Sequence, residues 1–229
     1  MKTMKIQCAI PTAGTVTMKF AHSLIRLYSD FILNQIDPEI HATMRLDVCE
    51  SSNWITNREK LVARAIADDF THVFFLDDDM VFTPDVLKML VKRDKDIVVT
   101  NYLLKTEPVH EAKFCAVGMD WETKVPTKEE STGLEKVAFA GFGCSLISTE
   151  VFKKVPQPWF QPYFVPDKNE YSTEDVAFFH RCEEQGIDVW LDHDTSKLLS
   201  HTGRKDWNWR ECVYQLEGAE NAEAQAALR

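Results

Sequence analysis

The sequence lacks several features that mark other classes of protein. None of its six cysteines forms a Cys-x-x-Cys pair, and most stand among apolar residues, which favours reduced, buried thiols and a cytoplasmic protein. No run approaches the roughly 20 apolar residues that a membrane-spanning helix needs. The apolar part of the N-terminus is short and interrupted by proline, unlike a signal peptide. We therefore expect a soluble protein without a membrane span.

Positive charge is also scarce, since 26 Lys and Arg residues face 36 Asp and Glu residues and leave a net charge of −10. This argues against a protein that grips polyphosphate over a broad basic face. A small anion bound through a metal is not excluded, because the cation brings its own positive charge. The turn after the first strand, Pro11–Thr15, holds a single glycine, which disfavours a nicotinamide-binding loop.

The sequence does contain a regular alternation of apolar strands and amphipathic helices over its first 100 residues. Helical periodicity follows the first strand, and helices are also predicted to begin at Thr56 and Thr83. The alternation predicts an α/β fold with a parallel, doubly wound sheet in one domain. The expected strands are Lys5–Ile10, Arg45–Cys49, His72–Leu76 and Asp96–Thr100.

The pattern changes after residue 100, where loops and short strands replace the regular alternation. The segment Pro156–Pro166 holds four prolines and four aromatic residues. It is too apolar for a free linker, so it either covers a cleft or packs on the core. A helix is expected from Ser172 to Gln185, ended by Gly186, and the tail 206–229 is expected to be helical.

Asp77, Asp78 and Asp79 directly follow a buried apolar strand. In open α/β sheets, ligands bind outside the carboxyl ends of the strands. Three adjacent carboxylates repel one another, and a divalent cation with oxygen ligands relieves that repulsion. If the extended geometry persists, Asp77 and Asp79 point to one side and Asp78 to the other. The alternative is a polar loop in which Asp79 caps a local turn.

Three further positions carry candidate chemistry, each with a plain structural alternative. Arg58, next to a predicted capping box at Thr56, suits a phosphate at a helix N-terminus, or is a surface arginine. Glu174 and Asp175 either supply a general base or complement the dipole of their helix. His201, at a strand end, either ligates a metal or is an ordinary polar residue.

In this order and spacing, the segments resemble GT-A-fold glycosyltransferases near the family 2-like group, including small phage-type members. The resemblance spans about residues 5–205 and implies a mostly parallel central sheet flanked by helices, with a smaller mixed acceptor-side sheet. Residues 1–100 would form the nucleotide-sugar-binding half and residues 101–205 the acceptor-side half of one domain, 1–229. Its carriers are AIPT, NREKLVARA, FFLDDDM, AGFGCSLIS, STEDVAFFHRCEEQG and SHTGRKDW.

The resemblance also implies a nucleotide-diphosphate-sugar donor, a UDP-sugar first, held through Mn²⁺ or Mg²⁺. The implied metal ligands are Asp77, Asp79 and His201. Lys205 matches a lysine of an HxxGxxK pattern at a spacing one residue shorter, which leaves Arg204 as its rival. Gly141, Phe142 and Gly143 match a loop on the acceptor side. The implied donor-binding residues are Pro11, Thr12, Glu50, Arg58, Asp77, Asp78, Arg204 and Lys205.

The implied reaction is sugar transfer to an acceptor hydroxyl, with inversion at the sugar carbon and Asp175, beside Glu174, as general base. A retaining reaction can share the same metal site. Two other functions stay open: a metal-dependent nucleotidyl or phosphoryl transferase, and a non-catalytic nucleotide-sugar-binding module. The expected acceptor is a glycan or lipid-linked sugar, with a modified DNA base as the alternative. The expected location is the cytoplasm, or the host cytoplasm if the protein is viral.

Overall fold

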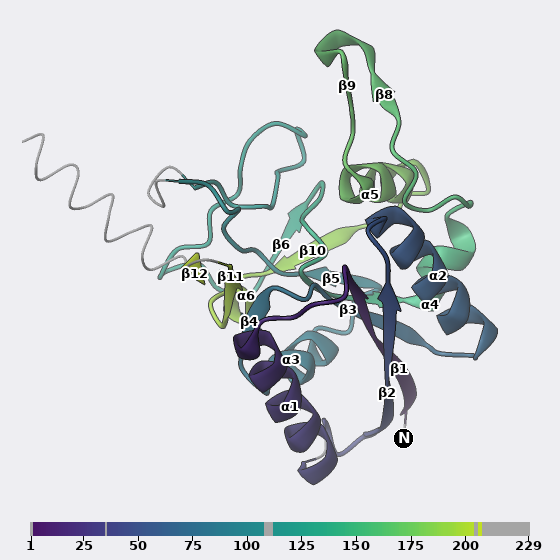
Figure 1. The fold of residues 1–229 in the computed structure, drawn as a ribbon, viewed down its shortest axis with the longest axis vertical. Coiled ribbons are helices and arrows are strands. Elements are labelled where there is room, and N and C mark those ends of the chain that lie inside the picture. The colour runs from purple at the N-terminus through teal and green to yellow at the C-terminus, as the bar shows by residue number, and fades with distance from the viewer. Residues whose placement is uncertain (1, 35, 108–111, 204–205, 208–229) are drawn as a thin grey trace, which may run out of the picture.

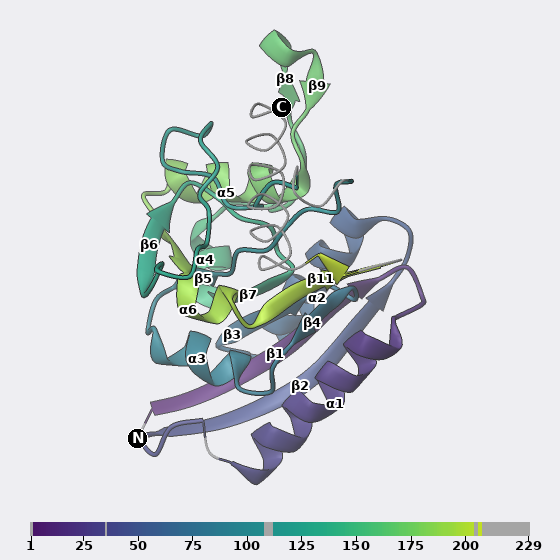
Figure 2. The same cartoon turned by 90° about the vertical axis from the view of Figure 1, so that its left-hand side faces the viewer.

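A central sheet organises the computed structural model, which describes residues 2–34, 36–107, 112–203 and 206–207 (Figures 1 and 2). The sheet has seven strands within this part of the chain, in the order β2-β1-β3-β7-β5-β10-β6. The register runs, for example, from Ile6 opposite His72 to Ala9 opposite Phe75 between β1 and β3. The strands are β1 (Lys2–Thr12), β2 (Ile40–Glu50), β3 (His72–Leu76), β5 (Ile97–Val99), β6 (Leu134–Val137), β7 (Cys144–Ser148) and β10 (Val189–Asp192).

The direction of the strands confirms a mostly parallel α/β sheet. β2, β1 and β3 pair in parallel, as do β5 and β10. β7 lies antiparallel between β3 and β5, so those two strands run in the same direction. β6 pairs antiparallel with β10 at the edge. The carboxyl ends of β1, β2, β3, β5 and β10 therefore meet at one edge of the sheet, where a ligand is expected.

Helices cover both faces of this sheet (Figure 1), with α1 and α3 on one side and α2 and α4 on the other. Phe74 and Phe75 of β3 are fully buried, as an apolar strand between two helical layers requires. The helices are α1 (Met18–Leu33), α2 (Trp54–Ala67), α3 (Val86–Lys92), α4 (Thr149–Lys154), α5 (Glu174–Glu184) and α6 (His193–Ser196).

A small three-stranded sheet stands beside the aspartates. It comprises β4 (Met80–Phe82), β11 (Leu199–Thr202) and β12 (Asp206–Trp207). Its strand pairs are antiparallel. β4 begins directly after Asp79, and its pairing with β11 puts His201 opposite Met80. This pairing brings two segments about 120 residues apart in sequence to one point.

Three helices begin at other residues than predicted, among them α3, which begins at Val86 after Asp85 and not at the expected Thr83 cap. The cap of α2 is Asn53, whose side chain accepts a hydrogen bond from the Thr56 amide at 3.0 Å, so the predicted capping box at Thr56 is wrong. Arg58 accordingly lies in the second turn and is buried. α5 begins after Thr173 rather than Ser172. The predicted helical tail starts instead with strand β12, and residues 208–229 lie outside the described part.

The cysteines in the described part of the chain agree with the expected thiol state. Cys8, Cys49, Cys115, Cys144 and Cys182 are free and buried. Burial raises the pKa of the Cys115 thiol to about 11, which makes it a poor nucleophile. Among the helices of the described residues, none has the length and apolar character to cross a bilayer.

Acid should destabilise the fold through His72, at the start of β3. Burial lowers the pKa of His72 to about 4, and the charge of Lys2 adds to this. The unfolded chain therefore binds the proton first, so stability is fully present above about pH 6.5 and falls by up to about 3 kcal/mol toward pH 4. Between pH 7.5 and 4.5, the free energy of urea unfolding should fall less in His72→Gln than in the wild type. Equal decreases in the two proteins would contradict this.

Candidate active site

The three aspartates lie in a turn rather than along a continued strand. The Met80 amide donates a hydrogen bond to the Asp77 carbonyl at 3.2 Å, which closes the turn directly after β3. The expected alternation of side chains therefore does not hold, since it required extended backbone. Asp77, Asp78 and Asp79 point instead to three different partners, and this divergence relieves their mutual repulsion without bringing the three carboxylates together.

Asp77 is held by a buried arginine. Nη2 of Arg58 donates to Oδ1 of Asp77 at 2.8 Å, and Nε lies 3.6 Å from Oε1 of Glu174. Arg58 is 3% exposed, and its guanidinium lies over the ring of Phe142 at 4.8 Å. Burial lowers the pKa of Arg58, but the charges of Asp77 and Glu174 more than offset it. Arg58 thus joins the aspartate turn after β3 to α5, and its expected contact with the donor stays a prediction.

Asp78 is held from the first strand. The Thr12 hydroxyl donates to Oδ2 of Asp78 at 2.6 Å and accepts a hydrogen bond from the Gly14 amide at 3.0 Å. The Thr12 carbonyl accepts from Ser51 and from the side chain of Asn57. Burial raises the pKa of Asp78, and the hydrogen bond from Thr12 opposes that rise. The turn after β1 and the aspartate turn therefore form one connected edge.

Asp79 faces two cationic partners. Its Oδ2 lies 2.5 Å from Nζ of Lys105 and 3.2 Å from Nε2 of His201. Burial raises the pKa of Asp79, but the hydrogen bonds and charges of His201 and Lys105 outweigh it and hold the pKa at about 2. The other oxygen, Oδ1, is buried and has no hydrogen-bond partner among the described residues. Asp79 is therefore ionised, and its Oδ1 remains able to coordinate a cation.

The orientation of His201 suits a metal ligand. Its Nδ1 lies 3.0 Å from the carbonyl oxygen of Leu103, which can only accept, so Nδ1 carries the proton. Its other ring nitrogen, Nε2, then faces the carboxylate of Asp79 at 3.2 Å. A backbone carbonyl on the second ring nitrogen is the usual support of a metal-binding histidine.

These observations fit a divalent cation at Asp79 and His201, although no group of three or more His, Cys, Asp or Glu side chains gathers around one point in the described residues. Asp77, the third expected ligand, is turned to Arg58. Mg²⁺ and similar ions need only one or two protein carboxylates when water and substrate phosphates complete the shell. The full expected set of Asp77, Asp79 and His201 stays a prediction.

The carboxylates of α5 lie beside Asp77. Burial raises the pKa of Glu174, and Arg58 offsets only part of this. Oδ1 of Asp175 accepts hydrogen bonds from the Thr173 hydroxyl and, at 2.8 Å, from the Val176 amide. Both bonds are local to the first turn of α5, where Glu174 and Asp175 also complement the helix dipole, the plain alternative for this pair. One oxygen of Asp175 is thus tied to its helix, and its role as general base stays a prediction.

The glycines of the 141–143 segment have a packing function. A Cβ at Gly141 would lie 2.0 Å from the hydroxyl oxygen of Tyr102, and one at Gly143 would lie 2.7 Å from its ring. The Tyr102 hydroxyl also accepts a hydrogen bond from the Gly143 amide at 3.1 Å. Phe142 is 2% exposed and packs in the aromatic core. Its side chain therefore belongs to the core, and the position of this loop on the acceptor side stays a prediction.

The other expected donor residues lie at the same edge or outside the described residues. Pro11 is a buried residue of β1, one residue before Thr12. Glu50 is exposed at the end of β2, and its carboxylate is so close to Gly14, at φ 106°, that a Cβ there would lie 2.7 Å from Oε1. Arg204 and Lys205 lie outside the described residues.

Two residues of the site were missed in the sequence, Lys105 and Tyr102. Both lie on the segment that leaves the buried strand β5, and its carboxyl end was the available signal. Lys105 places an ammonium against Asp79, and Tyr102 fills the space left by the two glycines. The sequence pattern does not reveal that β7 lies between β3 and β5. It therefore could not predict that the segment after β5 reaches the aspartates.

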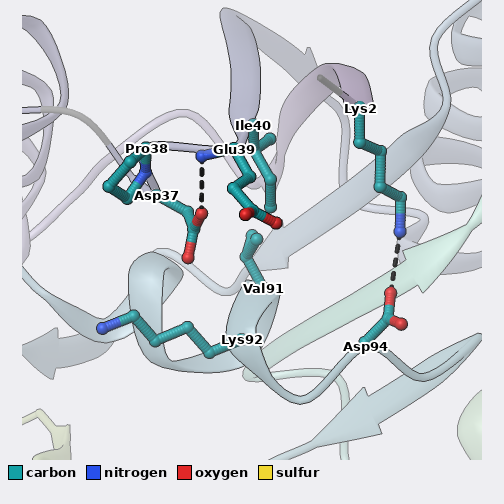
Figure 3. Close-up of a pocket in the computed structure, with 8 residues that line it drawn as sticks. All are labelled: Lys2, Asp37, Pro38, Glu39, Ile40, Val91, Lys92 and Asp94. Atoms are coloured by element: carbon teal, nitrogen blue, oxygen red, sulfur yellow. Dashed lines mark hydrogen bonds and ion pairs between the residues drawn. The ribbon is translucent and has the colours of Figure 1, made fainter.

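A hollow of about 700 Å³ lies elsewhere, at the amino ends of β1 and β2 (Figure 3). Lys2 there pairs with Asp94 at 2.7 Å, and the Asp37 carboxylate accepts from the Glu39 amide at 2.8 Å. Parallel sheets bind ligands at the opposite edge, so we assign no function to the hollow.

Comparisons with solved structures concern the fold. The crystal structure of A197 from STIV is 22% identical, covers 89% of this chain and 86% of its own, and has a TM-score of 0.54. The catalytic domain of Drosophila β1,4-galactosyltransferase 7 with xylobiose is 12% identical over 89% and 71%, at 0.48. A mutant of that enzyme with manganese, UDP-Gal and xylobiose is 13% identical over 87% and 71%, at 0.49. No protein-family model and no curated protein matches the sequence. The likeness to A197 supports the α/β fold.

Proposed function

We propose that the protein is a metal-dependent glycosyltransferase of the GT-A type, using a nucleotide-diphosphate-sugar donor. One observation carries the proposal: Asp79 and His201 face each other at the carboxyl edge of the sheet, and Oδ1 of Asp79 is buried without a partner among the described residues. A buried, unpaired carboxylate oxygen is costly. A divalent cation that also binds the donor diphosphate would give it a partner.

In this proposal, each residue of the site has a separate function. Asp79 and His201 would hold Mn²⁺ or Mg²⁺, which neutralises charge on the departing nucleoside diphosphate when bound. Lys105, a cation already at this point, would contact the diphosphate. Arg58 holds Asp77 and Glu174 in position through its ion pairs. Asp175 would accept the proton of the acceptor hydroxyl, with inversion at the sugar carbon.

Removing the Lys105 ammonium should change metal and donor affinity in opposite directions. Lys105→Met should bind Mn²⁺ about three- to tenfold more tightly without nucleotide, because a competing cation near Asp79 is gone. Its affinity for a UDP-sugar should fall, since the diphosphate loses a positive partner. Electron paramagnetic resonance of free Mn²⁺ and calorimetry measure the two affinities. Lys113→Met, an exposed lysine on the adjoining segment, is the control and should change neither.

A thermal-shift screen of nucleotide sugars, with and without Mn²⁺, tests the proposal. A UDP-sugar should raise the melting temperature only when the metal is present, as ligand linkage requires. Stabilisation by nucleoside triphosphates, with release of pyrophosphate, would assign a nucleotidyl transferase instead. Donor binding without turnover, unchanged by Asp175→Asn, would assign a binding module.

A further inference from the structure

A second cleft, of about 550 Å³, runs along the outer face of α5. Its other wall is the hairpin of β8 (Phe164–Val165) and β9 (Glu170–Tyr171), which projects beyond the body of the fold above α5 (Figures 1 and 2). Ser172 and Tyr163 exchange hydrogen bonds at the base of the hairpin. Its volume falls in the range of small-molecule sites.

Aromatic rings line this cleft from three segments. Trp121 stacks on Phe139 at 5.5 Å between ring centres, and His180 of α5 contacts both Trp121 and Tyr163. Tyr171 of the hairpin is 70% exposed. Soluble proteins rarely expose contiguous apolar patches, so large aromatic side chains exposed around a hollow indicate an interaction site.

Trp121 is held in an unfavourable backbone conformation. Its φ is 62°, in the left-handed region that a bulky side chain rarely adopts. Its Nε1 donates to the Glu183 carboxylate at 3.0 Å, and its ring stacks on Phe139 and meets His180 in a T-shaped contact. Strain of this kind persists only where the surroundings over-determine it, and it concentrates at binding sites. The indole is thus preorganised in the wall of the cleft.

The inner end of the cleft adjoins the proposed general base. Thr173 lines the cleft, and its hydroxyl donates to Asp175. Lys124, whose pKa is lowered chiefly by burial and raised in part by the charge of Asp175, lies over the Phe139 ring at 5.8 Å. A molecule in the cleft would therefore extend toward Asp175.

We propose that this cleft binds the saccharide chain of the acceptor, so that the substrate is an oligosaccharide whose terminal hydroxyl reaches Asp175. The inference rests on the proposed function. A pyranose ring has an apolar face of C–H groups and a rim of hydroxyls, so it needs a flat aromatic surface surrounded by polar groups. Trp121 and Tyr171 supply the surface, and Ser172, Glu170 and Glu183 supply hydrogen-bonding groups.

The charge of the cleft argues for this occupant over a nucleic acid. Aromatic stacking also serves single-stranded nucleic acids, but those sites add a positively charged groove that follows the phosphates. Here Glu170 and Glu183 outnumber the single lysine of the lining, Lys168, on a chain with a net charge of −10. A DNA acceptor would meet repulsion along this wall.

Binding of neutral oligosaccharides to the full-length protein tests the inference. The probes are malto-, cello-, xylo- and chito-oligosaccharides of one to four residues, measured by saturation-transfer NMR and calorimetry, with an eight-residue oligothymidylate beside them. At least one series should bind, with affinity rising with length. Trp121→Ala and Tyr171→Ala should each weaken it by at least about tenfold. Tyr171→Ala keeps the test valid if Trp121→Ala fails to fold, since Tyr171 is exposed.

Trp190→Ala removes a part-buried tryptophan outside the cleft and should leave the affinity within about twofold, as expected away from a hot spot. No binding of any oligosaccharide, binding of oligothymidylate in their place, or affinity indifferent to both cleft variants would overturn the inference. Mn²⁺-dependent UDP-sugar binding is measured in the same samples. If it persists while oligosaccharide binding fails, only this inference falls; the converse result would overturn the proposed function.

Discussion

Asp79→Asn should lower the affinity for Mn²⁺ by more than about 100-fold, because losing even an outer partner of a metal ligand costs 10- to 100-fold. The amide keeps the size of the side chain but removes the charge that Lys105 and His201 face. Metal-dependent binding of a UDP-sugar should disappear with it. Calorimetry with Mn²⁺ alone, then with donor and Mn²⁺, measures both effects.

Asp78→Asn is the matched control, because it changes a carboxylate in the same turn that bonds Thr12 instead. It should lower Mn²⁺ affinity far less than Asp79→Asn does. If the two variants lose Mn²⁺ affinity equally, the metal does not distinguish Asp79 from its neighbour. The assignment of Asp79 and His201 as ligands would then be wrong.

Arg58→Met should destabilise the fold by about 3–5 kcal/mol, the usual cost of removing one partner of a buried ion pair. Methionine fills the space over Phe142, so the lost stability reports the charge rather than a cavity. Asp77 and Glu174 are left facing each other without a cation. Urea unfolding at pH 7 measures the change, and Glu174→Gln added to Arg58→Met should restore part of the loss.

Arg64→Met, on the same helix, provides the comparison. Arg64 is half exposed and pairs with Asp47 at 3.0 Å, so its loss should cost no more than about 1 kcal/mol. Similar small losses in both variants would show that the Arg58 pair contributes little. The link between β3 and α5 would then need another explanation.

The first hundred residues were predictable because their elements are locally encoded. Four consecutive apolar residues in β3 and the spacing of Phe20, Leu24 and Leu27 in α1 each indicate one structure without knowledge of the rest. The position of β7 between β3 and β5 was not predictable. Strand order depends on long-range pairing, which leaves no periodic signal in the strand itself.

The site was predictable in part for the same reason. A carboxylate cluster at a strand end is a local signal, and it identified Asp77–Asp79. What each aspartate contacts depends on a turn closed by the Met80 amide and on pairing between β4 and β11. Extended geometry does not continue beyond Leu76, and Asp77 accepts a hydrogen bond from Arg58, a contact that the sequence pattern did not predict.

The aromatic residues after Pro156 were expected either to cover a cleft or to pack on the core, and the structure contains both cases. Trp159 and Phe160 are buried in the core. Tyr163 lines the cleft beside α5, and Phe164 is exposed on the hairpin that walls it. Composition alone could not predict which of these aromatic residues are buried and which are exposed, because the hairpin turn depends on Asn169 in a left-handed conformation.

The central claim is tested most directly by turnover. Purified protein with Mn²⁺, a panel of nucleotide sugars and an oligosaccharide acceptor is assayed for free nucleoside diphosphate and for a glycosylated product. We predict both products with one UDP-sugar, their loss on chelation of the metal, and their loss in Asp79→Asn. Equal release of nucleoside diphosphate by the wild type and Asp79→Asn, or release of pyrophosphate from a nucleoside triphosphate, would contradict it.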